Sequence, residues 1–283
     1  MTYLWSLLRQ TFADWNEHDA PSLGAALAFY SVLSLAPLVI LAIAIAAFIF
    51  GHTAAQTQLL DQVESMIGRQ GAEAVKGMIE HAREPASGAF ASIVGVITVL
   101  FGASGVFGEL RSALNRMWEV KAQTKGGVWR AIKQRFFSFG MVLAVGFLLL
   151  VSLVISAGLA AFGKFLAGLM LIPWFVLGAT SFVVSLAGVA VLFALIFRYV
   201  PETRIPWREA WIGAMVTAAL FTIGKVLIGL YLGKAAVGSA YGAAGSLVVV
   251  IVWVYYSAMI FFFGAEFTHV LYADRQKRLA NIR

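Results

Sequence analysis

Residues 245–270 read GSLVVVIVWVYYSAMIFFFGAEFTHV, and this stretch decides the fold class. It contains no charged side chain before Glu266, whereas a membrane-spanning helix needs roughly 20 mostly apolar residues. Its length and composition therefore predict a helix that crosses a bilayer and reaches polar surroundings near Glu266 and His269.

The whole chain has the composition of a membrane protein. Of its 283 residues, 61% are hydrophobic and only 12% are charged, whereas soluble domains carry about 25% charged residues. The predicted fold class is all-α: a polytopic membrane protein with six transmembrane helices plus short amphipathic helices, forming a single transmembrane domain over residues 1–283. The six windows are about Leu23–Phe50, Ala89–Phe107, Phe136–Phe162, Ile172–Phe197, Trp207–Leu232 and Ala244–Leu271.

The positions of the lysines and arginines predict the orientation. Six spans place both termini on one face, and 15 of the 21 basic residues fall on that face. They include those of a basic loop over residues 109–135 and a basic tail over residues 272–283. The positive-inside rule puts this face in the cytoplasm, which predicts a multi-pass protein of the bacterial inner membrane with cytoplasmic termini. Anionic lipid headgroups account for the net charge of +7, so we expect membrane lipids and no nucleic acid as partners.

Two segments outside the spans have helical apolar spacing. Residues 1–20 predict an interfacial helix on the cytoplasmic side, with Leu4, Leu7, Leu8, Phe12 and Trp15 along one side. Residues 52–88 predict an extracytoplasmic insertion of two short amphipathic helices, interrupted at Gly68 and Gly71.

The residue types present argue against catalysis and cofactor binding. The chain has no cysteine, and its four histidines, His18, His52, His81 and His269, form no ligand-spaced pair. It also lacks a GxxxxGK[ST] phosphate loop. We therefore expect no metal, no other cofactor and no enzymatic activity.

The first span carries polar residues and a proline in the stretch AALAFYSVLSLAPLVIL, residues 25–41. Pro37 removes a backbone hydrogen bond and kinks a helix, and Ser34 can compensate locally. Membrane helices tolerate proline, but together with Tyr30 and Ser31 this pattern predicts a helix that lines an internal cavity.

Two further cavity candidates lie toward the outer side. Lys225 is about 27 Å along the helix from Trp207, where its ammonium can snorkel to the outer interface or face a cavity that receives an anionic group. Tyr241 belongs to the glycine-rich stretch Lys234–Leu247, which is either a flexible loop or a re-entrant entry to the last span.

Charged residues at span ends predict an ion-pair network. Glu266 needs a partner near the membrane, and Arg111 or Arg198 can supply one. His269, three residues from Glu266, can join the network, and Glu109 lies where the second span ends. A structural clamp and a transport role both fit these residues.

Small residues at helix-packing spacing leave the oligomeric state open. Gly178, Ser181, Ser185 and Gly188 form one stripe, and the first span has another. Such stripes let helices approach closely, within one chain or between copies in a homo-oligomer.

Four stretches resemble the YihY/BrkB family of bacterial inner-membrane proteins. They are residues 25–41, ELRSALNRMWEV (residues 109–120), RYVPETRIPWREAWIGA (residues 198–214) and residues 245–270. The resemblance covers nearly the whole chain and implies six spans with cytoplasmic termini. Members have been labelled ribonuclease BN, but no acid–base pair or metal cluster in this sequence supports RNA hydrolysis.

Three functions remain open from the sequence. The first is a transporter or flippase for a lipid or another amphipathic anionic substrate, which the cavity candidates and the basic face favour. The second is a channel or secondary transporter for a small solute or ion, with Lys225, Glu266 and His269 as relay groups. The third is a membrane-organising scaffold without transport.

Overall fold

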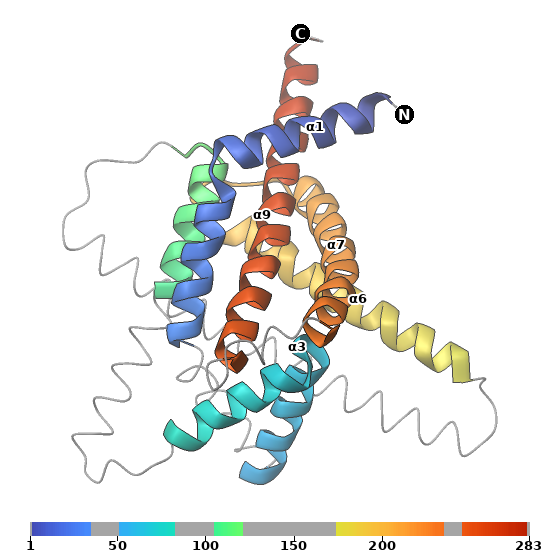
Figure 1. Ribbon diagram of the computed structural model, residues 1–283. Coiled ribbons are helices and arrows are strands. Elements are labelled where there is room, and N and C mark those ends of the chain that lie inside the picture. The colour runs from blue at the N-terminus through green and yellow to red at the C-terminus, as the bar shows by residue number, and fades with distance from the viewer. Residues whose placement is uncertain (1, 35–50, 83–104, 121–173, 235–244, 282–283) are drawn as a thin grey trace.

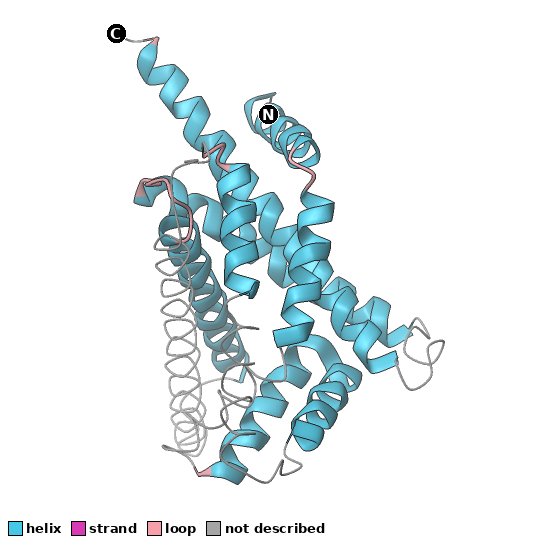
Figure 2. Cartoon of the chain, turned by 90° about the vertical axis from the view of Figure 1, so that its left-hand side faces the viewer, coloured by secondary structure: helices cyan, strands magenta, loops and turns pink. Residues whose placement is uncertain are grey.

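The computed structural model describes residues 2–34, 51–82, 105–120, 174–234 and 245–281, and within these ranges the chain forms helices and no strands (Figures 1 and 2). This confirms the all-α class for the described part of the chain. The helices are α1 (Thr2–Glu17), Ala20–Ser34, α3 (His52–Ala82), residues 105–117, α6 (Trp174–Tyr199), α7 (Trp207–Lys234) and α9 (Gly245–Ala280).

The predicted spans map onto these helices to different extents. Within the described residues, two helices are long and apolar enough to cross a membrane, Trp207–Tyr231 in α7 and Leu247–Ala280 in α9. They coincide with the fifth and sixth predicted windows, and α6 is helical across most of the fourth. The first two windows are described only in part, and the third lies outside the described residues.

The helix in the second predicted window continues beyond the window's end. That span was expected to end near Phe107, with a loop from residue 109, but residues 105–117 form one uninterrupted helix. Leu110, Ala113, Leu114 and Met117 are buried in the main core, so packing extends the helix past the charged residues. The rest of the predicted loop, residues 121–135, lies outside the described residues.

Helix α7 packs against both α6 and α9, and aromatic rings fill the core between them. The Phe197 and Phe261 centroids lie 5.2 Å apart, and Phe193 lies 5.7 Å from Phe261 and 5.8 Å from Phe221. These separations are typical of favourable aromatic pairs. The three helices are therefore joined by one apolar core.

The crossing of α7 and α9 depends on two reciprocal glycine–threonine contacts. A Cβ atom on Gly264 would overlap Oγ1 of Thr217 and lie 2.8 Å from its Cβ, and one on Gly213 would meet Thr268 in the same way. Each threonine hydroxyl donates to the glycine carbonyl four residues earlier in its own helix, at 2.7 Å. The two helices thus approach closely, and both threonine hydroxyls at the contact are hydrogen-bonded within their own helix.

Small residues also bring the helix Ala20–Ser34 close to its neighbours. A Cβ on Gly24 would lie 3.3 Å from the Met259 sulfur of α9, and one on Gly105 would lie 3.1 Å from the Tyr30 ring. By contrast, Ser185 and Gly188 of the α6 stripe are exposed. Nothing lies within 4 Å of a Cβ placed on Gly188, so this part of the stripe does not serve packing within the described chain.

Helix α1 lies across the end of the bundle where both termini meet (Figure 1). Leu7 is buried with Phe267 and Val270 of α9, whereas Leu4, Trp5 and Phe12 are more than 60% exposed. The apolar side predicted for this segment is therefore divided between a face that packs on α9 and a face that remains exposed.

Helix α3 lies at the opposite end of the bundle, where it contacts α9 and α7 (Figure 1). The two helices predicted for residues 52–88 are instead one helix, His52–Ala82, which Figure 1 shows to be bent. A glycine costs a helix only about 1 kcal/mol relative to alanine. Val75 and Ile79, buried with Val250 of α9, support the helix beyond Gly71.

Candidate functional site

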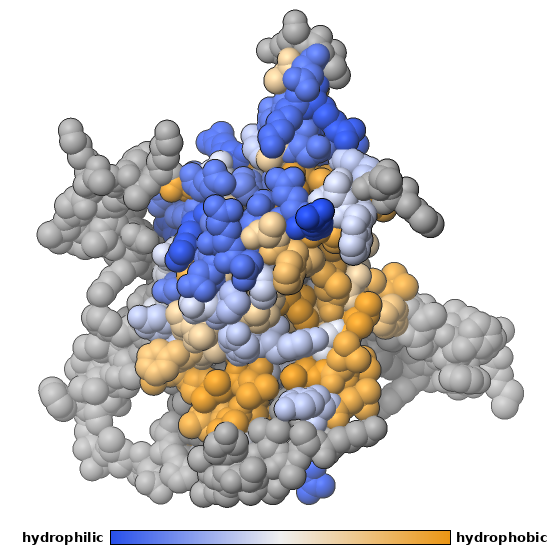
Figure 3. Space-filling model, turned by 45° about the horizontal axis from the view of Figure 1, so that its top comes forward, coloured by the Kyte–Doolittle hydropathy of each residue, from blue (hydrophilic) through white to orange (hydrophobic). Residues whose placement is uncertain are grey.

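Polar and charged residues gather at the end of the bundle that carries the termini. Figure 3 shows hydrophilic residues over the upper part of this face and hydrophobic residues below them. The interior of this end also contains ionisable groups, because Glu209 and Glu266 are both buried. Buried carboxylates are rare unless they are paired, so this end is the candidate functional site.

Two tight turns position the side chains of the site. Asp19 and Glu119 have positive φ angles of 57° and 49°, values that non-glycine residues seldom adopt. Glu119 ends the helix of residues 105–117 in a Schellman-type turn, in which the Val120 amide donates to the Asn115 carbonyl at 2.9 Å. His18 and Trp118 immediately precede these two residues, so each turn directs a ring toward α9.

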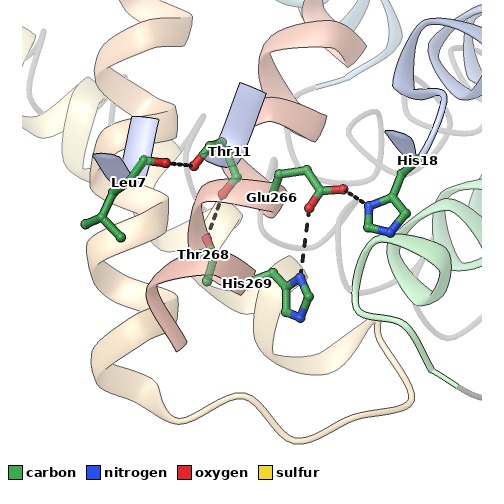
Figure 4. A network of polar contacts seen from close by, with 7 residues as sticks. Leu7, Thr11, His18, Glu266, Thr268 and His269 are labelled. Carbon is green, nitrogen blue, oxygen red and sulfur yellow. Dashed lines mark hydrogen bonds and ion pairs between the residues drawn. The ribbon is translucent and has the colours of Figure 1, made fainter. Parts of the chain in front are cut away.

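Glu266 of α9 lies between two imidazoles (Figure 4). Its Oε1 atom is 2.6 Å from Nδ1 of His18, and its Oε2 atom is 3.9 Å from Nδ1 of His269. Glu266 is 0% exposed. The His18 ring therefore makes a hydrogen bond across 248 residues of sequence, whereas His269 is close without being bonded.

Several polar atoms around Glu266 are left without partners. Oε2 of Glu266, Nδ1 of His269 and the indole nitrogen of Trp118 are buried, and none has a hydrogen-bond partner in the described part of the chain. The Trp118 ring lies 5.1 Å from the His269 ring. Unpaired buried polar groups cost about 1–3 kcal/mol each, which makes this cluster unusual in the bundle.

Other ion pairs join separate elements of the bundle. Arg275 of α9 bonds the buried Glu209 of α7. Arg111 lies 3.0 Å from Glu202 in the connection between α6 and α7. On the outside, the Tyr3 hydroxyl donates to Asp274 at 2.7 Å, and this hydrogen bond raises the pKa of Tyr3 above its ordinary value.

The predicted ion-pair candidates are only partly brought together. Glu266 and His269 are neighbours, as the sequence suggested, but the hydrogen-bond partner of Glu266 is His18. Arg198 instead donates to the Ile205 carbonyl, and its guanidinium lies 5.4 Å from the Trp207 ring centre. Glu109 is half-buried and has no ion pair with another described residue.

Three cavity candidates of the first span, Tyr30, Ser31 and Ser34, lie in the described residues. The Ser34 hydroxyl is buried and donates to the Ser31 carbonyl at 3.1 Å, and Tyr30 is 40% exposed. Pro37 and Tyr241 lie outside the described residues.

Lys225 lies in the second half of α7, next to Gly224, which packs against Tyr256 and Ile260 of α9. It is half-buried, and no carboxylate of the described chain lies within 4 Å of its ammonium. Phe221 and Ile228 share its helix stripe. The Phe221 ring centre lies 6.2 Å from that of Trp253 in α9, and Trp253 also packs against the cluster that contains Ile228. The indole nitrogen of Trp253 is buried and has no hydrogen-bond partner among the described residues.

Sequence reasoning missed His18, Glu209, Arg275 and Trp253. No spacing rule connects His18 to Glu266, because the two are far apart in the chain. A signal for Glu209 was present, since a carboxylate in the first turn of a helix is favoured by the helix dipole. Among the described residues, no three histidine, aspartate or glutamate side chains are placed to hold a metal ion.

Comparison with known proteins gives a consistent result. The chain is 30% identical over 273 residues to a UPF0761 membrane protein of Verminephrobacter eiseniae, covering 94% of this chain and 62% of that protein. It is 29% identical over 270 residues to a UPF0761 membrane protein of Albidiferax ferrireducens, covering 92% and 61%. The chain thus spans about three fifths of the length of these relatives. No solved structure matches. The virulence factor BrkB family model matches residues 11–282, so this chain belongs to that family.

Proposed function

We propose that this chain is an integral protein of the bacterial inner membrane that moves a lipid or another amphipathic anion across the bilayer. In this proposal six helices span the membrane and both termini are cytoplasmic. The long apolar helices α7 and α9 support it, as does the shared position of the termini at the polar end of the bundle. Exposed cations at that end, Arg9, Arg116, Arg208 and Lys277 among them, suit anionic headgroups.

The observation that carries the proposal is the environment of Lys225. Its neighbours Val226 and Leu227 are exposed apolar side chains, as expected of a helix that faces lipid. In a helix each Cα–Cβ bond tilts toward the N-terminus, which here directs the lysine stem toward Phe221 and away from the outer end of α7. An ammonium held in apolar surroundings without a carboxylate can receive an anionic group.

Trp253 of α9 offers a second donor on the side of α7 that Lys225 shares with Phe221, because the Phe221 ring packs edge-on against the Trp253 ring. Trp253 lies where α3, α7 and α9 meet, since it packs against the buried cluster of Val75, Ile79 and Val250 and against the cluster of Ile228 and Val249. An ammonium and an indole N–H are both hydrogen-bond donors. Together they match a phosphate or carboxylate headgroup whose acyl chains remain in the bilayer.

The test is lipid movement in vesicles that contain the purified protein. Labelled anionic and zwitterionic phospholipids are followed from one leaflet to the other. We expect protein-dependent movement of the anionic lipid, a loss of at least tenfold in Lys225→Met and retention of most activity in Lys225→Arg. Lys277→Met removes one of several exposed cations at the end that carries the termini, and it should reduce the movement much less than Lys225→Met does. Movement no faster than in empty vesicles, across several headgroups, would overturn the proposal.

A scaffold without transport is the second candidate. The Ser34 hydroxyl donates to the backbone carbonyl of Ser31 in its own helix, and aromatic rings fill the core among α6, α7 and α9. Both observations favour a closely packed bundle. Cross-linking that captures one constant partner, together with vesicles in which no lipid moves, would favour the scaffold.

A further inference from the structure

The two imidazoles beside Glu266 connect a buried carboxylate to the surface. The His18 and His269 side chains are 16% and 17% exposed, whereas Glu266 is 0% exposed. A proton from the surrounding water can therefore reach the carboxylate through the hydrogen-bonded His18 ring, and the His269 ring lies 3.9 Å from the second carboxylate oxygen. This is the arrangement of a proton-exchange site, and it uses residues that the proposed lipid carrier does not.

Charge balance at the cluster depends on one proton. With both imidazoles neutral, Glu266 is a buried negative charge. The charged groups that act on it are His18, Asp14 of α1 and Glu119 at the end of the helix of residues 105–117, with His269 one turn along α9. Asp14 and Glu119 add to the negative potential. One bound proton makes the group of Glu266 and two imidazoles neutral, which removes the cost of an unpaired buried charge.

The cluster lies at the joint between α1 and the next helix. His18 is in the turn after α1, and α1 is held to α9 by Leu7, which is buried with Phe267 and Val270. Opening this joint would admit water to Glu266 and stabilise the unprotonated carboxylate.

We propose that His18, Glu266 and His269 form a proton-binding site whose occupancy holds α1 against α9. The packed joint binds the proton more tightly than the open joint does. By linkage, proton loss as the pH rises favours the open joint, and proton uptake favours the packed one. This inference does not depend on which molecule the protein carries.

Thiol labelling can follow the joint, because the chain contains no cysteine. Leu7→Cys places a reporter in the α1–α9 contact, and Gln10→Cys places an exposed reporter on the same helix. The ratio of their labelling rates with a maleimide corrects for ionisation of the thiol. We expect this ratio to rise at least threefold between pH 6 and pH 9 in protein held in lipid nanodiscs.

Two background substitutions test the assignment. Glu266→Gln has no carboxylate to bind the proton and should make the labelling ratio independent of pH. Glu209→Gln, at the other buried carboxylate, should leave the rise of the labelling ratio with pH unchanged. His18→Gln keeps an amide donor for Glu266 but removes the nearer base, and should reduce the rise. A labelling ratio that does not change with pH in protein that carries only the reporter cysteine would overturn the proposal. This measurement does not depend on whether the Glu266 and His18 variants fold. An unchanged rise in Glu266→Gln would also overturn the proposal.

Discussion

Two faces of one short segment of α9 serve different purposes. Gly264 and Thr268 face α7 in a contact where every hydroxyl is hydrogen-bonded. Glu266, between them in sequence and rotated about 200° around the helix from each, faces the His18 turn. There one carboxylate oxygen and two ring nitrogens lack partners. The α7 face is therefore closely packed, and the Glu266 face carries the proton exchange that we propose.

The α7 face should be the less tolerant of the two. Gly264→Ala places a Cβ against Thr217, which must move together with its helix, so we expect a loss of more than about 3 kcal/mol in the free energy of unfolding. Unfolding in mixed detergent micelles measures it. Gly188→Ala is the matched control, because its Cβ meets nothing within 4 Å, and it should be neutral or stabilising. Equal tolerance at both positions would contradict this account of the crossing.

The Glu266 face should show an intermediate effect. His18→Ala removes the only hydrogen bond of Glu266 to another described residue and should cost about 2 kcal/mol. Tyr3→Phe removes a second link between α1 and α9, the exposed bond to Asp274, and should cost less than about 0.5 kcal/mol. The same unfolding assay compares them. A larger effect of Tyr3→Phe than of His18→Ala would mean that the exposed contact, and not the buried one, holds the joint.

Local patterns predicted the helices well. Apolar length identified α7 and α9, because a run of 20 apolar residues has few alternatives to a helix. The low helix propensity of glycine led us to divide α3 at Gly68 and Gly71. Propensity takes no account of the packing of Val75 and Ile79 on α9, which supports one continuous helix.

The site was less predictable. Glu266 and His269 were identified from the free-energy cost of placing polar side chains in an apolar helix, but the partner of Glu266 was not identified. Pairing with His18 depends on the turn at Asp19 and on how α1 crosses α9, and neither follows from spacing in the sequence. The Gly264–Thr217 contact was missed for the same reason, because it joins two segments that only the fold brings together.

Disulfide formation between α1 and α9 tests the central claim, that the C-terminal half of α9 holds the α1 joint, most directly. Leu7 and Val270 share a buried cluster, whereas Leu8 is 39% exposed. In the cysteine-free chain, the pair Leu7→Cys and Val270→Cys should cross-link readily under mild oxidation, and Leu8→Cys with Val270→Cys should not. Equal cross-linking of both pairs, or none of the first, would contradict the account.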